Sequence, residues 1–236
     1  CGAQVDYAIP DRITDGYGVN ERLVRKAAED GVDAILTCDN GIAAAKELSL
    51  AKELGMAVII TDHHEIPYEE GADGEKIFHI PAADAVVNPK QPDCPYPFKE
   101  LCGAAVAFKL VQALYEKSGL PPEEAWAYLE NAAFATVGDV MPLTGENRII
   151  VKEGLKALNQ TRNFGIRALA ARNQIELGKI KAYHIGFVLG PCLNASGRLD
   201  TAKRALDMLL AENEYIAAEY AGDLYDLNVS RKEMTE

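Results

Sequence analysis

The sequence lacks three features that would assign it to common protein classes: long apolar runs, paired cysteines and a surplus of basic residues. No apolar run in the 236 residues approaches the roughly 20 residues that a membrane-spanning helix needs, so we expect no membrane segment. Residues 1–20 contain three aspartates and no apolar core, so we expect no signal peptide. The five cysteines are odd in number and show no Cys-x-x-Cys spacing, which argues against a disulfide framework or a zinc site and favours a reducing cytoplasm.

The chain holds 24 basic against 36 acidic residues, a net charge of −12. Broad, non-specific binding of nucleic acid depends on basic surface, so the charge argues mildly against it. A nucleic-acid enzyme with a local basic groove, or with an acidic cluster neutralised by metal, stays compatible with this balance. At 48% hydrophobic and 25% charged residues, the composition is typical of a soluble globular protein of one large domain or two smaller ones.

Two short apolar runs each end in polar side chains that are suited to metal. The first run leads to Asp39, and the second leads to Asp62, His63 and His64. Residues 43–55, between the two runs, have helical spacing, so the unit is predicted as strand, helix, strand. Because parallel strands end at the same edge of a sheet, Asp39 and the two histidines should face one crevice. Carboxylate oxygen and imidazole nitrogen suit a divalent transition ion such as manganese.

Each of these residues also has a plain structural explanation. A lone Asp39 at a strand end could cap a helix or form a turn. Adjacent His63 and His64 point in different directions, so one could ligate metal while the other contacts substrate. Asp139 follows Gly138 at the end of an apolar helix, where aspartate is typical of a turn. Beside Asp39 and His63, however, it would serve as a third ligand.

A second group of polar residues lies in the segment 190–200, which is predicted as a loop just before a helix. Asn194, Ser196 and Arg198 could cradle a phosphate there, because backbone N–H groups and a guanidinium attract anions. The alternative is a well-capped loop in which Arg198 pairs with Asp200. Arg12 is a weaker phosphate candidate of the same kind, since arginine in a turn is commonly just solvated. His79 and His184 are assigned to surface or packing roles.

The remaining pattern predicts short strands first and helices later. Residues 3–9 and 84–87 read as strands, and the polar segment 65–83 reads as a surface excursion. Asn20 is predicted to cap a helix of about residues 21–30 that Gly31 ends. Further helices are predicted over residues 103–117, 123–137, 147–159, 164–171, 179–189, 201–210 and from 214 to the end.

Five ordered blocks resemble the DHH phosphoesterase superfamily and, more specifically, the bacterial RecJ single-stranded-DNA exonucleases. The superfamily resemblance lies in Asp39-Asn40-Gly41, Asp62-His63-His64 and Gly138-Asp139; the RecJ resemblance lies in Pro10–Gly18 and Leu193-Asn194-Ala195-Ser196-Gly197-Arg198-Leu199. This resemblance implies an α/β fold in which a parallel sheet with flanking helices is followed by a mostly helical portion. Residues 1–120 would be the α/β part of the DHH domain, 121–212 its helical part, and 213–236 the start of a connector helix.

The resemblance also implies an activity and a role for each site residue. It implies a hydrolase that uses two Mn²⁺ or Mg²⁺ ions to degrade single-stranded DNA from the 5′ end, in DNA repair and recombination. A single-stranded-DNA-binding protein and a recombination helicase are the implied partners. Asp39 would bridge the ions, and His63 and Asp139 would ligate one of them. The phosphate would be held by Arg12, His64, Asn194, Ser196 and Arg198, and Asp62 would support the site.

The chain departs from the family pattern at its start. The family's first motif, Asp-x-Asp-Gly, is not present, and the sequence begins in the middle of a predicted strand without a methionine. We therefore expect an N-terminally truncated excerpt, inactive alone, whose missing carboxylates and C-terminal binding domains lie elsewhere in the protein. Two alternatives stay open. One is a DHH phosphoesterase acting on nanoRNA, a cyclic dinucleotide or pyrophosphate, and the other is a non-catalytic replication scaffold, against which the intact ligand set argues.

Overall fold

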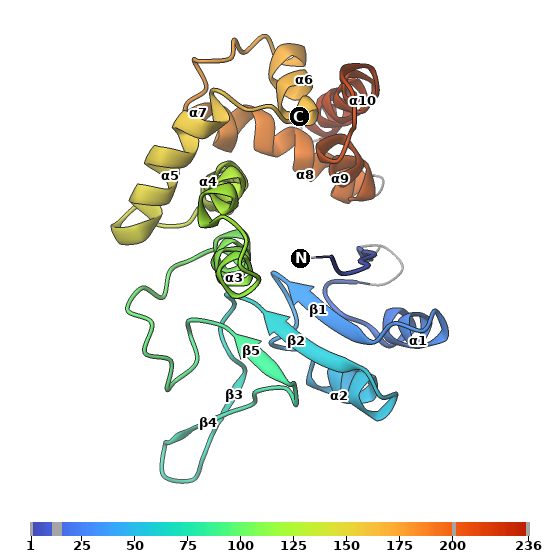
Figure 1. Ribbon diagram of the computed structural model, residues 1–236, viewed down its shortest axis with the longest axis vertical. Helices are drawn as coiled ribbons and strands as arrows, with labels where there is room; N and C mark the ends of the chain where they lie inside the picture. Colours follow the sequence, from blue (N-terminus) through green and yellow to red (C-terminus); the bar gives the residue numbers. More distant parts are fainter. Residues whose placement is uncertain (1, 11–15, 200–201, 235–236) are drawn as a thin grey trace. The chain divides into compact units, whose positions relative to one another are not determined.

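The computed structural model describes residues 2–10, 16–199 and 202–234. They form two compact units, one of residues 2–10 and 16–126 and the other of residues 127–199 and 202–234. The first unit contains both strands and helices and the second is helical (Figure 1). Within these described residues, no helix combines the length and the apolar character that crossing a bilayer requires.

A three-stranded parallel sheet forms the centre of the first unit, as predicted. Its strands are β1 (Ala34–Cys38), β2 (Ala57–Thr61) and β5 (Ala85–Val87), in the order β1-β2-β5. Cys38 pairs with Thr61, and Thr61 pairs with Val87, so the three strands end level with one another. Whatever follows each strand therefore meets at one edge of the sheet, which is the geometry that the sequence pattern requires for a shared site.

Helices α1 (Glu21–Glu29) and α2 (Ala45–Glu53) build the core of this unit against the sheet. The side chain of Asn20 accepts a hydrogen bond from the N–H of Leu23 at 2.9 Å, and Gly31, with φ +74°, follows the helix end. Both predicted helix boundaries are thus confirmed. The buried apolar residues of this core are Val24, Leu48, Ala51, Met56, Val58 and Ile60.

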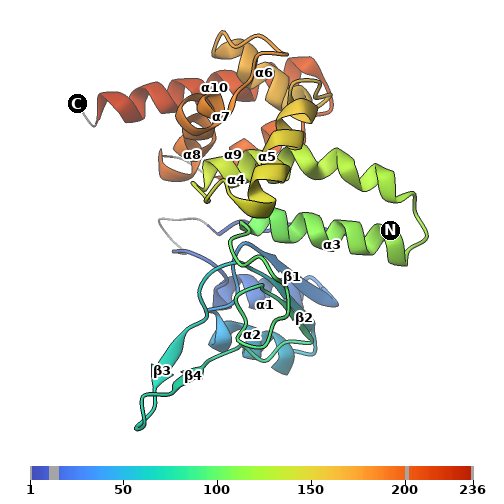
Figure 2. The ribbon, with the colours of Figure 1, turned by 90° about the vertical axis from the view of Figure 1, so that its left-hand side faces the viewer.

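Helix α3 (Gly103–Lys117) is confirmed over its predicted range and contacts β1 and β2. The segment 65–83 contains a β-hairpin that was not predicted, β3 (Tyr68–Glu70) with β4 (Lys76–Phe78), which projects away from the sheet (Figure 2). The strand predicted over residues 3–9 is wrong, because these residues are exposed and form no ladder with another strand in the described ranges. A segment with strand-like residues becomes a strand only where a neighbour takes up its backbone hydrogen bonds.

The second unit consists of helices, most of them close to the predicted ranges. Two predicted helices are divided: the one over residues 123–137 is a 3₁₀ helix followed by α4, and the one over 179–189 is a short α-helix followed by a π-helical turn. The 3₁₀ helix η1 (Pro122–Tyr128) spans the boundary between the units, and the elements that follow are α4 (Leu129–Gly138), α5 (Gly145–Leu158), α6 (Phe164–Arg172), α7 (Ala182–His184), η2 (Ile185–Leu189), α8 (Gly190–Leu199), α9 (Lys203–Leu209) and α10 (Glu214–Glu233).

The predicted loop over residues 190–200 is wrong, because residues 190–199 form helix α8. Pro191 lacks the backbone N–H that a regular helix uses, but the π-helical turn before it widens the hydrogen-bond ladder, and Gly190 donates to the carbonyl of Ile185. Leu189, Cys192 and Ser196 are all fully buried, at the three- to four-residue spacing of a helix face. The Gly-Pro pair and the polar residues concealed this spacing in the sequence.

Helix α10 organises the core of the second unit by packing on α6, α8 and α9. Fully buried side chains from each of these helices meet there, so the segment from 190 to 199 is held in the core on one of its faces. The largest of these buried residues are Leu158, Leu169, Ile185, Leu189, Met208 and Leu224.

Candidate metal centre

Asp39 stands at the carboxyl end of β1 on a tightly turned backbone. Its N–H continues the sheet ladder by donating to the carbonyl of Thr61 at 3.0 Å, and its φ of +62° lies in the left-handed region. Aspartate is one of the few non-glycine residues that tolerate this conformation. The chain turns on through Asn40, whose side chain donates to the carbonyl of Cys38, and Gly41 at φ +106°. This turn leaves the Asp39 carboxylate at the edge of the sheet.

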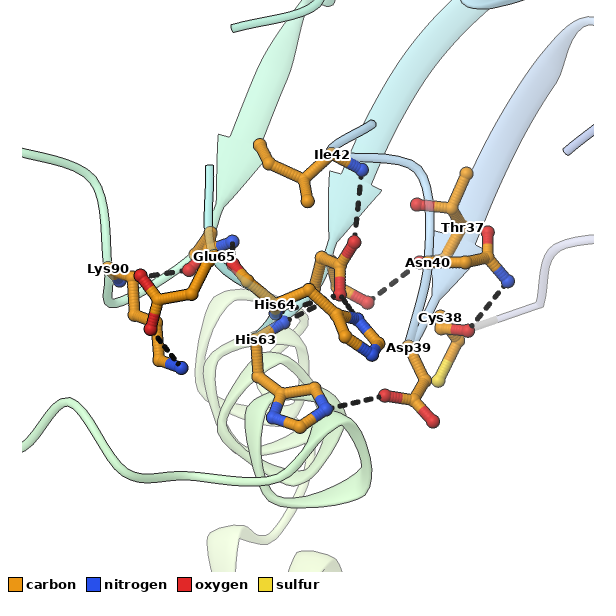
Figure 3. Close-up of polar contacts among 12 residues, drawn as sticks. Thr37, Cys38, Asp39, Asn40, Ile42, His63, His64, Glu65 and Lys90 are labelled. Carbon is orange, nitrogen blue, oxygen red and sulfur yellow. Dashed lines mark hydrogen bonds and ion pairs between the residues drawn. The ribbon is translucent and has the colours of Figure 1, made fainter. Parts of the chain in front are cut away.

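His63 stands opposite Asp39, just beyond the end of β2. Its Nε2 lies 3.0 Å from Oδ1 of Asp39 (Figure 3). The imidazole is 9% exposed, whereas the carboxylate is 56% exposed, so the pair joins a buried ring to a solvent-facing acid. Two ligands at right angles on one ion, each about 2.1 Å from it, lie about 3 Å apart. The pair therefore fits two ligands of a single divalent cation.

His64 completes a cluster of three groups that could hold a metal ion. One ligand atom each from Asp39, His63 and His64 lies within 4.8 Å of the others. Nδ1 of His64 is engaged by the carboxylate of Asp62 at 2.7 Å, so it carries the proton of that hydrogen bond. Its Nε2 is then left to ligate a metal when the ring is neutral, or to donate to an anion when this nitrogen also carries a proton.

Asp62 is the buried hub of the site, with only 1% of its surface exposed. Its Oδ2 accepts the N–H of Ile42 at 3.0 Å, and its Oδ1 accepts the N–H groups of His63 and His64 at 2.7 and 3.2 Å. Burial alone would raise the pKa of Asp62, but these N–H groups and the His64 ring together hold that pKa below its usual value. The carboxylate is therefore ionised, and it fixes both histidines relative to the turn after Asp39.

Two residues that support the site were not predicted from the sequence. The Asn88 side chain, 2% exposed, donates to the carbonyl of His64 at 3.0 Å from just beyond the end of β5. Ile42 contributes a backbone N–H to Asp62 from 20 residues away. The only sequence signal for Asn88 is its position directly after the third strand, at the edge where the other strands present their site residues.

The remaining predicted site residues lie in the second unit or outside the described residues. Asp139 is the C-terminal cap of α4, and its N–H donates to the carbonyl of Ala135. In α8, Asn194 is exposed, whereas Ser196 is buried and donates its hydroxyl hydrogen bond to the carbonyl of Leu193 at 2.9 Å. Arg12 lies outside the described residues, as does the side chain of Arg198. A shared site that includes Asp139 stays a prediction.

The other two histidines make local contacts. Nε2 of His79 lies 3.3 Å from the Glu69 carboxylate on the exposed hairpin. Nδ1 of His184 accepts the N–H of Lys181 at the start of α7. Both contacts belong to the surface or to a helix start, in keeping with the roles assigned from the sequence.

A parallel sheet whose adjacent strands end in an aspartate and an Asp-His-His segment defines the class of this protein. The model of the DHH family, N-terminal domain, matches residues 1–135, and the chain belongs to this family.

Within the family, the chain is similar to the single-stranded-DNA-specific exonucleases named RecJ. It is 44% identical over 232 residues to RecJ of Bacillus subtilis, and 35% identical over 244 residues to RecJ of Escherichia coli. These matches cover 98% and 99% of this chain but only 28% and 41% of the two relatives. The chain thus spans less than half the length of the relatives that it matches.

Solved structures agree with the fold described above. A crystal structure of exonuclease RecJ bound to manganese is similar to this chain, with 37% identity and a TM-score of 0.84. The match covers 98% of this chain and 55% of the RecJ chain. RecJ of Thermus thermophilus in complex with Mn²⁺ has 36% identity and a TM-score of 0.75. This match covers 91% of this chain and 30% of the Thermus chain. The predicted fold class, a parallel sheet with flanking helices followed by a helical portion, is confirmed.

Proposed function

We propose that this protein is a metal-dependent exonuclease that hydrolyses single-stranded DNA from its 5′ end. The observation that carries the proposal is the pairing of Asp39 with His63, 3.0 Å apart at the carboxyl edge of the sheet. The two groups stand as a ready ligand pair in a chain that is 44% identical to a single-stranded-DNA-specific exonuclease. The structures of relatives with Mn²⁺ and Mg²⁺ support these two ions as the cofactors.

In this proposal Asp39, His63 and Asp139 would hold the divalent ions. When bound, two such ions supply an activated water and neutralise charge on the phosphate. Asp62 keeps the two histidines in place through its hydrogen bonds. His64 contacts the scissile phosphate through Nε2, since its Nδ1 is already bonded to Asp62.

The helical unit is proposed to contribute the rest of the phosphate contacts. Exposed Asn194 and the guanidinium of Arg198 would bind phosphate oxygens, with Arg12, which lies outside the described residues, as a further contact. Ser196 has a buried hydroxyl that is already bonded to the Leu193 carbonyl, so we assign it to holding α8.

The wider setting of the enzyme is also proposed. Single-stranded DNA would be the substrate in repair and recombination, and a single-stranded-DNA-binding protein and a recombination helicase would be partners. A reducing cytoplasm is proposed because the four cysteines among the described residues form no disulfide. Residues 1–120 and 121–212 are proposed as the two parts of the DHH domain, with a connector helix from 213.

The test is a digestion assay of the intact protein with Mn²⁺ on 5′-labelled single-stranded and double-stranded DNA. We expect mononucleotides from the single strand alone. Changing residues that merely support a metal ligand already costs about 10- to 100-fold, so Asp39→Ala and His63→Ala should each lower the rate by more than about 100-fold.

Asp30→Asn is the matched control, because it removes an exposed carboxylate that pairs with Lys26 on the helix surface, away from the candidate metal ligands. It should digest DNA at the wild-type rate. Wild-type rates for Asp39→Ala or His63→Ala would refute the assignment of the ligands. Cleavage of a cyclic dinucleotide, a short RNA oligomer or pyrophosphate in place of DNA would move the substrate to the small-molecule branch of the family.

A further inference from the structure

Gly103, the first residue of α3, lies against the carboxylate of Asp39. A Cβ placed on Gly103 would lie 2.3 Å from Oδ1 of Asp39 and 2.5 Å from both its Cβ and its Cγ, which is far inside contact distance. Among the glycines of the described residues, this is the one where a candidate metal ligand occupies the space that a side chain would fill. Because glycine has no side chain, Gly103 leaves room for the Asp39 carboxylate at this point.

The start of α3 cannot withdraw to make room for a larger residue. Helix α3 contacts both β1 and β2, and Gly103 itself is buried. Its neighbours in the same turn are between 0% and 2% exposed: Leu101, Cys102, Ala105 and Val106. A tightly packed interior transmits strain instead of absorbing it.

Asp39, in contrast, is able to move. Its side chain is 56% exposed, and it stands on a turn with a left-handed backbone. A methyl group on residue 103 would therefore displace the whole Asp39 side chain, including its Cβ, from the position in which Oδ1 lies 3.0 Å from Nε2 of His63. The helix itself would not suffer, because alanine has a higher helix propensity than glycine.

We propose that Gly103 is a positioning residue of the metal centre. By leaving room at the start of α3, it allows the Asp39 carboxylate to stand 3.0 Å from His63, where both reach one divalent cation. The inference rests on the proposed function for the use of the metal in DNA hydrolysis, but the effect on metal binding is independent of the substrate.

The test compares Gly103→Ala with Gly222→Ala in the intact protein. Gly222 lies in α10, and a Cβ placed there would meet nothing within 4 Å, so it is a matched control for the same change in a helix. The dissociation constant of Mn²⁺ is measured from the electron paramagnetic resonance signal of the free ion. Gly103→Ala should raise it by about 10- to 100-fold, the range found when residues that orient metal ligands are changed, whereas Gly222→Ala should leave it unchanged.

DNA hydrolysis supplies a readout that a general loss of structure would not give. The Mn²⁺ concentration needed for half-maximal rate should rise in Gly103→Ala, while KM for single-stranded DNA at saturating Mn²⁺ should stay at the wild-type value. A wild-type dissociation constant for Mn²⁺ in Gly103→Ala would overturn the proposal. If the wild-type protein digests no DNA but Gly103→Ala still weakens Mn²⁺ binding, the proposed function fails and the positioning role stands.

A second pair of variants decides the matter if Gly103→Ala does not fold. Asp39→Gly removes both the carboxylate and the Cβ, and glycine accepts the positive φ of this position. Gly103→Ala in the Asp39→Gly background should then unfold at the same temperature as Asp39→Gly alone or at a slightly higher one, because alanine favours the helix. An unfolding temperature of the double variant clearly below that of Asp39→Gly would show that a side chain at residue 103 clashes with something other than Asp39. This result would contradict the inference.

Discussion

The two units of this protein place polar side chains in different ways. In the α/β unit, Asp39 and His63 follow directly after strands whose ends lie level, and both stand at one edge of the sheet. In the helical unit, Asn194 and Ser196 lie on different faces of one helix, the first exposed and the second fully buried. Residues two apart in a helix differ by about 200° in direction, so a short motif there does not converge on one point.

This difference shows which kind of motif translates directly into geometry. The parallel register of a sheet brings together residues that follow neighbouring strands, whatever the length of the connection. A helix gathers residues only at intervals of three or four. Single substitutions at the hydrogen-bonded site around Asp62 should therefore lower stability and metal binding more than single substitutions of polar residues in the second unit.

Asp62→Asn should have the largest effect, because it replaces a buried acceptor of four hydrogen bonds. Asparagine has the same shape, but its amide group turns a donor toward donors and leaves some of them unsatisfied. We expect a loss of about 2–4 kcal/mol in the free energy of unfolding, measured with denaturant in the absence of metal. Binding of Mn²⁺ should also weaken, by about 10- to 100-fold.

Asp30→Asn in α1 is the control for this change, since it also removes one carboxylate from the same unit but at an exposed position. It should leave both stability and Mn²⁺ binding unchanged. Wild-type stability of Asp62→Asn would mean that the hydrogen bonds to Asp62 do not hold the site together.

Gly154→Ala should show that the glycines of the helical unit serve packing. A Cβ on Gly154, in α5, would lie 2.2 Å from Cβ of Ala133 in α4 and 2.9 Å from the carbonyl of Leu129. Forcing the two helices apart should cost about 1–3 kcal/mol of unfolding free energy, the usual range for overpacking. The affinity for Mn²⁺ should fall less than in Gly103→Ala, because residue 154 contacts α4 several residues before its C-terminal cap Asp139 and contacts no proposed ligand directly.

Gly222→Ala again provides the comparison, because its surroundings are open. It should be neutral or stabilising by up to about 1 kcal/mol, as helix propensity alone predicts. If Gly154→Ala were equally neutral, the close contact between α4 and α5 would make no measurable contribution to the unfolding free energy.

The parts that could be predicted from the sequence are those fixed by local pattern and by sheet register. Asn20 and Gly31 mark the ends of α1 because capping depends on residues three or four apart. The pairing of Asp39 with His63 was predictable because both follow buried strands, and parallel strands end together.

The parts that could not be predicted depend on contacts between distant residues. Asn88 and the N–H of Ile42 support the site through hydrogen bonds across 24 and 20 residues, and neither belongs to a recognisable motif. Helix α8 was missed because Gly190 and Pro191 normally end a helix, whereas here a π-helical turn accommodates them. The prediction of a strand over residues 3–9 was wrong because the residue pattern of a segment does not show whether a neighbouring strand pairs with it.

Glu130→Gln should change the pH dependence of stability in the helical unit. Burial raises the pKa of Glu130 above its usual 4.5, and the hydrogen bond from the Thr161 hydroxyl opposes this only in part. Because the folded-state pKa is raised, stability from this group is complete below pH 4.5 and is lost as the pH rises through the raised pKa. Glu130→Gln should therefore gain stability relative to wild type in thermal unfolding as the pH rises above 4.5.

Glu153→Gln, in α5, should show the opposite sign. The hydrogen bond from Lys156 lowers the pKa of Glu153, so its contribution is present above its usual pKa and is lost as the pH falls. Glu153→Gln should thus lose a little stability relative to wild type at pH 7 and none at low pH. The same sign for both variants would contradict the assignment of burial as the cause at Glu130.

Ser196→Ala should have the smallest effect, although the residue is fully buried within the block that resembles the family motif. Its hydroxyl donates to the Leu193 carbonyl one turn back, an acceptor in the same helix, so removing it should change the unfolding free energy by less than about 1 kcal/mol. Measured with saturating Mn²⁺, KM for single-stranded DNA should also stay at the wild-type value, whereas Asn194→Ala, which alters an exposed amide on the same helix, should raise it. A rise in KM for Ser196→Ala as large as that for Asn194→Ala would mean that the hydroxyl leaves the Leu193 carbonyl for the phosphate, and that α8 presents both of its faces to the substrate.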